Sequence, residues 1–391
     1  MYENFDRIAK MVSDDIDGGG IAGASVAVFH KGKQVYNGNF GYADKEKGVP
    51  MSDNTMFRMF SMTKPVTACA AMILMEQGKI SFNDPLKWYL PTFENPQVLD
   101  EKGTRPADRD ILLKDLMSMT SGICYPEDSP AGRKMGEVWW RVSTEQAEKG
   151  YSLSTHDFAL EMGKIPLAFT PGERWMYGAS ADIMGAVIEV CSGMKLSEFM
   201  EKEIFAPLGM KDTGFYIPAE KYDRLATCYY YDDKQGCLAP FTEPQLCLTE
   251  YRTPPSFESG GAGLVSTIAD YGRFGMMLAN GGELEGVRIL GRKTVDFMTE
   301  NMLTEKQKAS LEWDSMRGYG YGNLMRILEN RSNAACNASL GEFGWDGWTG
   351  NFFMADRTEN LVFLYFIQRA GAGTTPLALR LKNTVNSAIN D

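Results

Sequence analysis

Histidine is scarce in this sequence: only His30 and His156 occur in 391 residues. His30 ends a strand-like apolar run and His156 stands at a predicted helix start, so neither neighbourhood resembles a catalytic loop. No Gly-x-Ser-x-Gly segment, the nucleophile turn of many serine hydrolases, occurs either. A Ser-His-Asp hydrolase is therefore not expected. A serine nucleophile in this chain would need a base other than histidine.

Paired cysteines are also missing. The seven cysteines are scattered, odd in number and without a Cys-x-x-Cys pair. With two histidines in the chain, this pattern predicts no metal site and no disulfide framework. We expect buried free thiols in a reducing cytoplasm. The residues concerned are Cys69, Cys124, Cys191, Cys228, Cys237, Cys247 and Cys336.

Basic runs and long apolar runs are absent too. The net charge is −11, which argues against nucleic acid or an anionic membrane as a partner. No apolar run reaches the roughly 18 residues that a membrane span needs. Residues 1–17 carry acidic side chains where a secretory signal would be apolar, so they read as an amphipathic helix. We expect a cytoplasmic globular protein.

The order of predicted elements indicates an α+β fold. Residues 23–44 read as a β-hairpin, residues 347–368 as two further strands with a turn between them, and the region between the two ends is mostly helical. We expect a central antiparallel sheet built from both ends of the chain and flanked by helices, with an inserted helical subdomain. The boundaries predicted are 1–82 with 177–391 for the sheet domain and 83–176 for the insertion. The active site would lie at their junction.

One segment, MFSMTKPVTA, combines a serine and a lysine three residues apart at a predicted helix start. Ser61 could be the N-cap of this helix, and Pro65 suits the first helical turn. Alternatively, Ser61 is a nucleophile and Lys64, on the same helix face, is its base. The spacing alone does not decide, because the chain has a second Ser-x-x-Lys at Ser192 and Lys195.

Two further segments could complete a serine site. Tyr177 stands between a turn and a helix start, where its hydroxyl could relay a proton if nearby cations lowered its pKa, or where its ring could simply pack. The segment FGWDGWTGNFF places Gly347 and Gly350 around Trp348 at a strand start. Backbone N–H groups there could form an oxyanion hole, or the glycines could only make a hairpin turn.

Taken together, these segments resemble the serine β-lactamase and penicillin-binding-protein-like hydrolases. The chain is most similar to the branch shared by class C β-lactamases and family VIII carboxylesterases. The fold expected from this resemblance is the β-lactamase/transpeptidase-like one. Six segments match in order: GASVAVFHKGKQVYNGNFGYAD, FRMFSMTKPVTA, GKISFNDPLKWYLPTF, DLMSMTSG, PGERWMYGASADIMGAVIE and GGAGLVSTIADYGRF.

The resemblance implies roles for individual residues. Ser61 would be the acylated nucleophile, Lys64 the general base and Tyr177 the proton relay. The backbone N–H groups of Ser61 and Trp348 would form the oxyanion hole, and Gly347 would leave room beside that strand. No metal or organic cofactor is required.

Two departures from the penicillin-recognising members bear on the substrate. Trp345-Asp346-Gly347 stands where those enzymes carry Lys-Thr-Gly, so the cation that meets a substrate carboxylate is missing and Asp346 would repel one. Ala179 replaces the asparagine that binds a substrate amide. Both changes favour neutral small-molecule esters, with Trp345 and Trp348 packing on the substrate.

The leading expectation is a carboxylesterase. The alternatives are a β-lactamase, a D-amino-acid peptidase or acyltransferase with the same acyl-enzyme, and a non-catalytic binding protein. The natural ester and the oligomeric state are left open. Some aromatic residues could line the pocket or belong to the core: Trp139, Trp140, Tyr229, Tyr230, Tyr231 and Phe257.

Overall fold

The computed structural model describes residues 5–246 and 251–390. Its centre is an eight-stranded sheet in which every neighbouring pair is antiparallel, in the order β12-β13-β14-β15-β16-β1-β2-β3. Both chain ends contribute strands, as the sequence predicted, and the α+β fold class is confirmed. The strands are β1 Gly23–His30, β2 Lys33–Asp44, β3 Val49–Pro50, β12 Tyr319–Gly322, β13 Met325–Leu328, β14 Phe343–Asp346, β15 Phe352–Asp356 and β16 Leu361–Phe366.

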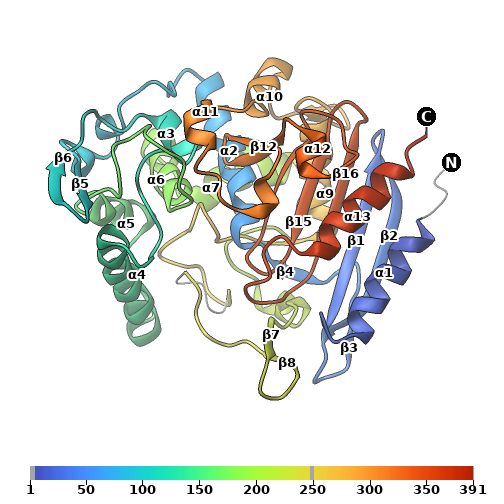
Figure 1. Ribbon diagram of the computed structural model, residues 1–391. Coiled ribbons are helices and arrows are strands. Elements are labelled where there is room, and N and C mark those ends of the chain that lie inside the picture. The colour runs from blue at the N-terminus through green and yellow to red at the C-terminus, as the bar shows by residue number, and fades with distance from the viewer. Residues whose placement is uncertain (1–4, 247–250, 391) are drawn as a thin grey trace.

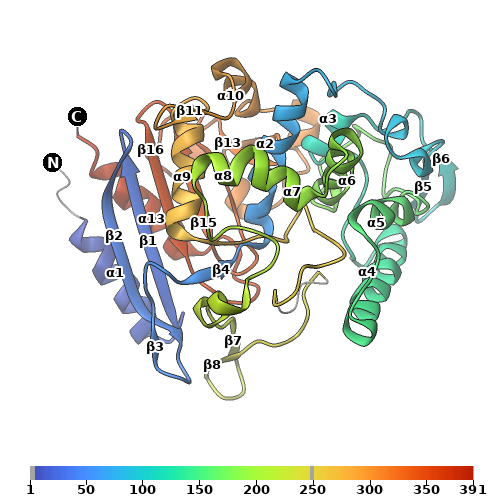
Figure 2. The ribbon, with the colours of Figure 1, turned by 180° about the vertical axis from the view of Figure 1, so that it is seen from behind.

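Helices cover both faces of this sheet. Helices α1 (Asp6–Asp17) and α13 (Pro376–Ser387) lie side by side on one face, and α9 (Ile268–Ala279) crosses the other (Figures 1 and 2). β1 and β16 are buried along their whole length, because layers pack on both of their faces. The predicted N-terminal amphipathic helix is confirmed, with Phe5, Ile8 and Val12 buried.

Most of the remaining helices gather beyond the α9 face, away from α1 (Figure 2), but α12 (Arg331–Ala334) lies near α13, whose Asn383 donates to the Ala335 carbonyl oxygen at the end of α12. The central one is α2 (Thr63–Glu76), which packs against α6 (Ser180–Ser192), and α6 ends at Gly193 in the left-handed conformation that glycine favours. The others are α3 Leu113–Met117, α4 Pro130–Lys149, α5 Thr155–Met162, α7 Leu196–Met200, α8 Ala206–Leu208, α10 Arg292–Met298 and α11 Glu305–Lys308.

Short elements complete the chain. Four two-stranded sheets pair β4 (Met56–Arg58) with β9 (Val265–Thr267), β5 (Gln97–Asp100) with β6 (Gly103–Pro106), β7 (Tyr229–Asp232) with β8 (Cys237–Pro240), and β10 (Glu283–Leu284) with β11 (Val287–Arg288). A π-helical turn, η4 Glu201–Phe205, joins α7 to α8. The 3-10 turns are η1 Phe60–Met62, η2 Leu86–Trp88, η3 Pro91–Phe93, η5 Ala219–Arg224 and η6 Asp314–Met316.

Helices α3, α4 and α5 fall inside the predicted insertion, residues 83–176. They are not separated from the rest, since α6 contacts both α3 and α5 and one apolar core runs from α2 through α6 into this region. The domain boundaries therefore stay a prediction. What matters for the site is that the segment before α2, the turn before α6 and the end of β14 converge.

Candidate active site

The turn that carries Ser61 is strained and does not cap a helix. Ser61 lies in η1, and α2 begins two residues later with Met62 at the N-cap and no side-chain cap bond. The helix-cap interpretation is thus wrong. Phe60, just before the serine, has a φ of 45°, in the left-handed region that costs a non-glycine residue about 1–3 kcal/mol. The turn leaves Ser61 partly exposed at the start of the helix.

Lys64 is fully buried beside Ser61. Its Nζ lies 3.1 Å from Ser61 Oγ, 3.2 Å from the Tyr125 hydroxyl and 2.9 Å from the Gly261 carbonyl oxygen. Burial lowers the pKa of Lys64 to about 7, and the negative charge of Asp182 opposes this shift. Near neutral pH, a substantial fraction of this amine is therefore unprotonated and can accept the serine proton.

Tyr177 lies in the turn before α6, on the other side of Ser61. Its hydroxyl accepts a 3.0 Å hydrogen bond from Trp345 Nε1 and its ring lies 4.5 Å from Lys64 Nζ. Burial raises the pKa of Tyr177, although hydrogen bonds with Ser61 and Trp345 work against the shift. Nearby cations do not lower this pKa, because burial has the largest effect and the negative charges of Asp346 and Asp182 add to it. A neutral hydroxyl can still pass a proton on.

The end of β14 brings Trp348 next to the nucleophile. A Cβ on Gly347 would lie 2.6 Å from the carbonyl oxygen of Met59, so only glycine lets the two segments approach this closely. The rings of Phe60 and Trp348 then lie tilted against each other, with their centroids 5.2 Å apart. This places the two backbone segments that were predicted to supply the oxyanion hole side by side.

A network of hydrogen bonds around the Arg58 backbone holds these two segments together. The carbonyl oxygen of Arg58, three residues before Ser61, accepts hydrogen bonds from Asn351 Nδ2 at 2.9 Å, Gln368 Nε2 at 3.2 Å and Thr349 Oγ1 at 3.3 Å. The Arg58 N–H also donates to Gln368 Oε1 at 3.1 Å. Because all of these side chains are buried, the distance between the nucleophile turn and the β14 turn is fixed by the fold.

Asp346 does not face the site. Alternation along β14 directs Trp345 toward Tyr177 and Asp346 to the α13 side of the sheet. There its carboxylate pairs with the buried Arg326 at 2.5 Å and accepts a hydrogen bond from Thr374. Arg326 pairs with this charge on the far face, yet the Asp346 carboxylate still contributes to the raised pKa of Tyr177, so the repulsion of a substrate carboxylate stays a prediction. Asp346 also makes no wall of the site.

Two residues that sequence reasoning missed complete the surroundings of Lys64. Tyr125 contacts the lysine through its hydroxyl, and Asp182 lies buried on α6. Asp182 Oδ1 accepts from Ser259 Oγ at 2.5 Å and from the Gly261 N–H at 3.0 Å, while Oδ2 has no partner among the described residues. The available signal was an acidic residue inside the apolar helix that follows Tyr177.

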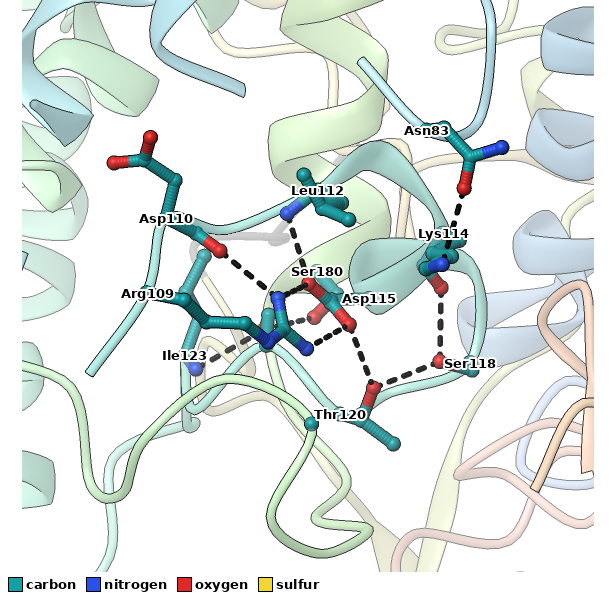
Figure 3. A network of polar contacts seen from close by, with 12 residues as sticks. Asn83, Arg109, Asp110, Leu112, Lys114, Asp115, Ser118, Thr120, Ile123 and Ser180 are labelled. Atoms are coloured by element: carbon teal, nitrogen blue, oxygen red, sulfur yellow. Dashed lines mark hydrogen bonds and ion pairs between the residues drawn. The ribbon is translucent and has the colours of Figure 1, made fainter. Parts of the chain in front are cut away.

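The turn that carries Tyr125 is braced by an ion pair. Asp115 lies between Arg109 and Thr120, with its oxygens 2.6 and 2.8 Å from the Arg109 guanidinium (Figure 3). Further along, Ser121 Oγ bonds Ser180 Oγ at 2.8 Å, which joins this turn to the start of α6. The two tyrosines beside the lysine are thus positioned by one connected framework.

Aromatic rings surround Tyr177. Trp313 stands edge-on at 5.0 Å and is half exposed, while Trp345 and Trp175 pack at 5.6 and 6.2 Å. A cavity of about 670 Å³ adjoins the other side, where Phe60 and Trp348 form part of its wall. The partly exposed Ser61 and Tyr177 therefore lie between an aromatic wall and a cavity large enough for part of a substrate.

Most of the aromatic residues proposed for the pocket lie elsewhere. Trp139 and Phe257 pack in the core with Phe158, and only Trp139 approaches the site, 6.0 Å from the Tyr125 ring. Trp140 is exposed on α4, Tyr229 is buried against Glu46, and Tyr230 and Tyr231 are surface residues of the β7–β8 hairpin. The pocket interpretation is wrong for Trp140, Tyr229, Tyr230 and Tyr231, while Trp139 and Phe257 belong to the core that lies behind Tyr125.

The cysteines are more exposed than expected. Cys69, Cys124 and Cys228 are buried free thiols, Cys191 and Cys336 are partly exposed, and Cys237 is exposed. Cys247 lies outside the described residues. Within residues 5–246 and 251–390, no group of three or more histidine, cysteine or acidic side chains could hold a metal ion. Over the same ranges, no helix combines the length and apolarity needed to cross a bilayer.

Comparison with known proteins agrees with this geometry. The Beta-lactamase family model matches residues 8–383. The chain belongs to the Beta-lactamase family. Among its relatives is Esterase EstB of Burkholderia gladioli, 28% identical over 385 residues that cover 93% of this chain and 91% of EstB. Lovastatin esterase of Penicillium rubens is 35% identical over 396 residues, covering 94% of each chain.

A solved structure shares the whole fold of this Beta-lactamase family member. EstCE1, described as a hydrolase with promiscuous acyltransferase activity, superposes with a TM-score of 0.80 at 25% identity and covers 98% of this chain and 97% of its own. The predicted β-lactamase/transpeptidase-like fold is confirmed. With esterases among its relatives over nearly the full length, the chain is a serine hydrolase of the β-lactamase fold.

Proposed function

We propose that the protein cleaves small carboxylic esters through a Ser61 acyl-enzyme. The observation that carries this proposal is the buried Lys64, whose Nζ lies 3.1 Å from Ser61 Oγ and whose pKa falls to about 7. An amine poised near the working pH is suited to general-base catalysis, and it supplies the base that two distant histidines cannot.

Acylation begins when neutral Lys64 accepts the Ser61 proton. Oγ then attacks the ester carbonyl carbon, and the carbonyl oxygen becomes an oxyanion that the N–H groups of Ser61 and Trp348 stabilise. Collapse breaks the bond to the alcohol oxygen. The leaving oxygen takes the Tyr177 hydroxyl proton, and protonated Lys64 restores it through the cluster around Ser61.

Deacylation repeats this sequence with water. The regenerated Lys64–Tyr177 pair removes a proton from water as its oxygen attacks the acyl carbon, and the proton then returns to Ser61 Oγ as the carboxylic product leaves. The negative charge of Asp182 raises the pKa of Lys64, and the Tyr125 hydroxyl is hydrogen-bonded to Lys64 Nζ. None of these steps calls for a metal or an organic cofactor.

The surroundings favour esters over β-lactams. Trp345 stands where a penicillin-recognising enzyme carries a lysine, and it binds Tyr177 rather than offering a cation. The relatives EstB and lovastatin esterase are named as esterases. We infer that small-molecule esters are the partners of this site, bound between the aromatic wall around Trp313 and the cavity beside Phe60.

Acyl transfer is the second candidate. It needs the same acyl-enzyme but an alcohol or amine in place of water, and EstCE1, similar over its whole length, is described as having promiscuous acyltransferase activity. Adding alcohols or amines to an ester reaction distinguishes the two. Transfer products that outnumber the free acid would favour this candidate.

A substrate panel tests the proposal. Purified protein is assayed with p-nitrophenyl esters of increasing acyl length, a chromogenic cephalosporin and a D-alanyl amide, each beside the Ser61→Ala variant. We expect turnover of the short esters, reduced by about 10³-fold or more in Ser61→Ala. Cephalosporin turnover well above ester turnover would contradict the ester assignment, and unchanged turnover in Ser61→Ala would contradict catalysis by this site.

A further inference from the structure

The turn that follows β14 carries the candidate oxyanion donor Trp348, and its backbone is supported mainly from one side. Register pairs β14 with β15 up to Asp346, opposite Phe352, but pairs β14 with β13 only at Phe343 and Gly344. Trp345 and Asp346 therefore have no strand partner on the β13 side within the described residues. A strand end with one free edge is less constrained than the interior of a sheet.

Side chains replace the missing strand partner. Arg326 of β13 stands opposite Gly344, and its side chain, 3% exposed, reaches along the strand to Asp346 Oδ1 at 2.5 Å. The other carboxylate oxygen, Oδ2, accepts a hydrogen bond from Thr374 in the segment before α13. Asp346, the last residue of β14, thus links β13 to residues 369–375, the segment before α13, which is called the α13 approach below.

The same α13 approach holds the next residues of the turn by its backbone. The Gly373 N–H donates to the Trp348 carbonyl oxygen at 3.3 Å, and the Arg369 N–H donates to that of Thr349 at 2.9 Å. Since the first of these bonds is long, Thr374 adds the stronger, charge-assisted link. The orientation of the Trp348 N–H depends on both ends of this short turn.

We propose that Asp346 is a positioning residue which, through Arg326 and Thr374, keeps the Trp348 N–H directed at the substrate oxygen. This inference rests on the proposed function, because it assumes an oxyanion beside Ser61. It gives a role to a charged residue that reaches no substrate. The penalty of holding a carboxylate on the far face is offset by its pairing with a buried guanidinium.

Thr374→Val is the first test, because it removes only the link to the α13 approach and keeps the ion pair. We expect kcat for a p-nitrophenyl ester to fall by about 3- to 10-fold, a fraction of the loss of a whole oxyanion donor. KM and the melting temperature should change little. Thr384→Val is the matched control and should keep kcat, because this α13 hydroxyl, among the described residues, is hydrogen-bonded to the Arg380 carbonyl oxygen and the Met11 sulfur.

Asp346→Asn is the stronger variant. We expect kcat to fall by about 10-fold or more, and the affinity for a boronic acid that mimics the tetrahedral intermediate to fall in parallel. Asp356→Asn, at a buried carboxylate of β15 whose partners lie at the other end of the sheet, should lower only the melting temperature. A loss of boronic-acid affinity is a result that mere destabilisation would not give.

The outcomes separate the inference from the proposed function. If the native protein hydrolyses esters and loses this activity in Ser61→Ala, but Thr374→Val and Asp346→Asn keep native kcat and boronic-acid affinity, the positioning role is overturned while the proposed function stands. If the native protein hydrolyses none of the esters, both are overturned together.

Discussion

Two fully buried lysines lie on opposite sides of the central sheet, and they differ in their partners. Lys382 on α13 pairs with Glu342 at 3.0 Å and also contacts the Tyr319 hydroxyl. Lys64 on α2 forms no ion pair with a described residue; its hydrogen bonds are with neutral oxygens, and the Tyr177 ring lies beside it. The direct ion pair suits Lys382 to a structural role, whereas Lys64, without a direct ion pair and with its pKa lowered by burial to about 7, can exchange its proton.

Replacing each lysine by methionine would break this comparison most strongly. In Lys64→Met, ester turnover should fall by about 10³-fold or more, because the base is lost, while stability is kept or rises since an unpaired buried amine is removed. In Lys382→Met, turnover should persist but stability should fall by about 3–5 kcal/mol, because Glu342 stays buried without its lysine and keeps only the weaker hydrogen bond from the neutral Tyr319 hydroxyl. Steady-state kinetics and denaturant unfolding measure the two effects.

The contrast between a catalytic Lys64 and a structural Lys382 would be contradicted if the two variants behaved in the opposite way. Full activity in Lys64→Met would show that Lys64 is not the base, and loss of activity in well-folded Lys382→Met would show that Lys382 is more than structural. The pair of variants is its own control, since the same atoms are removed in both.

The chemically distinctive part of the site was predictable from the sequence. Ser61, Lys64 and Tyr177 each belong to a local segment with a helix start or a turn, and the shortage of histidines left the lysine as the base. The sheet was predictable for the same reason, because its strands near both chain ends have strong local patterns. The structure brings the three side chains together around Ser61 Oγ.

What could not be predicted depends on contacts between distant segments. Tyr125 and Asp182 are 61 and 118 positions from Lys64, and no local pattern shows that they surround it. The side to which Asp346 points depends on the strand register, and its ion pair on Arg326, 20 residues away. The helix-cap interpretation of Ser61 failed because helix α2 begins later than the apolar pattern suggested.

The two tyrosines that contact the site give a second, smaller comparison. Tyr177 has hydrogen bonds with Ser61 and Trp345, whereas the hydroxyl of Tyr125, among the described residues, is hydrogen-bonded to Lys64. We expect Tyr177→Phe to lower kcat by about 10²- to 10³-fold, since the proton relay to the leaving group is lost. Tyr125→Phe should cost about 10-fold or less, because Lys64 keeps Gly261 and Ser61.

Both variants retain the ring, so the aromatic packing around them is preserved. Single-turnover acylation with a p-nitrophenyl ester is the measurement, because it isolates the step in which the relay acts. A larger loss in Tyr125→Phe than in Tyr177→Phe would show that Tyr125, and not Tyr177, passes the proton to the leaving group, and would contradict the proposed proton path.

The smallest expected effect is a shift of the pH profile when the charge of Asp182, near Lys64, is removed. The groups that face this amine are the Ser61 and Tyr125 hydroxyls, the Tyr177 ring, the Gly261 carbonyl and, as the charged member, Asp182 on α6. Burial lowers the pKa of Lys64 to about 7 and Asp182 raises it. Ester hydrolysis should therefore lose kcat/KM as pH falls through about 7, where Lys64 becomes protonated.

Asp182→Asn removes this charge but keeps an oxygen that can accept from Ser259 and from the Gly261 N–H. Without the carboxylate, protonated Lys64 is less favoured and its pKa falls further, so the acidic limb of the kcat/KM profile should move down by on the order of one pH unit. Asp356→Asn, which removes a buried carboxylate on another part of the sheet, should leave the limb in place. A limb that stays fixed or moves up in Asp182→Asn would mean that the group titrating near pH 7 is not Lys64. In that case, the absence of an ion pair at Lys64 would no longer explain why this lysine, unlike Lys382, acts in catalysis.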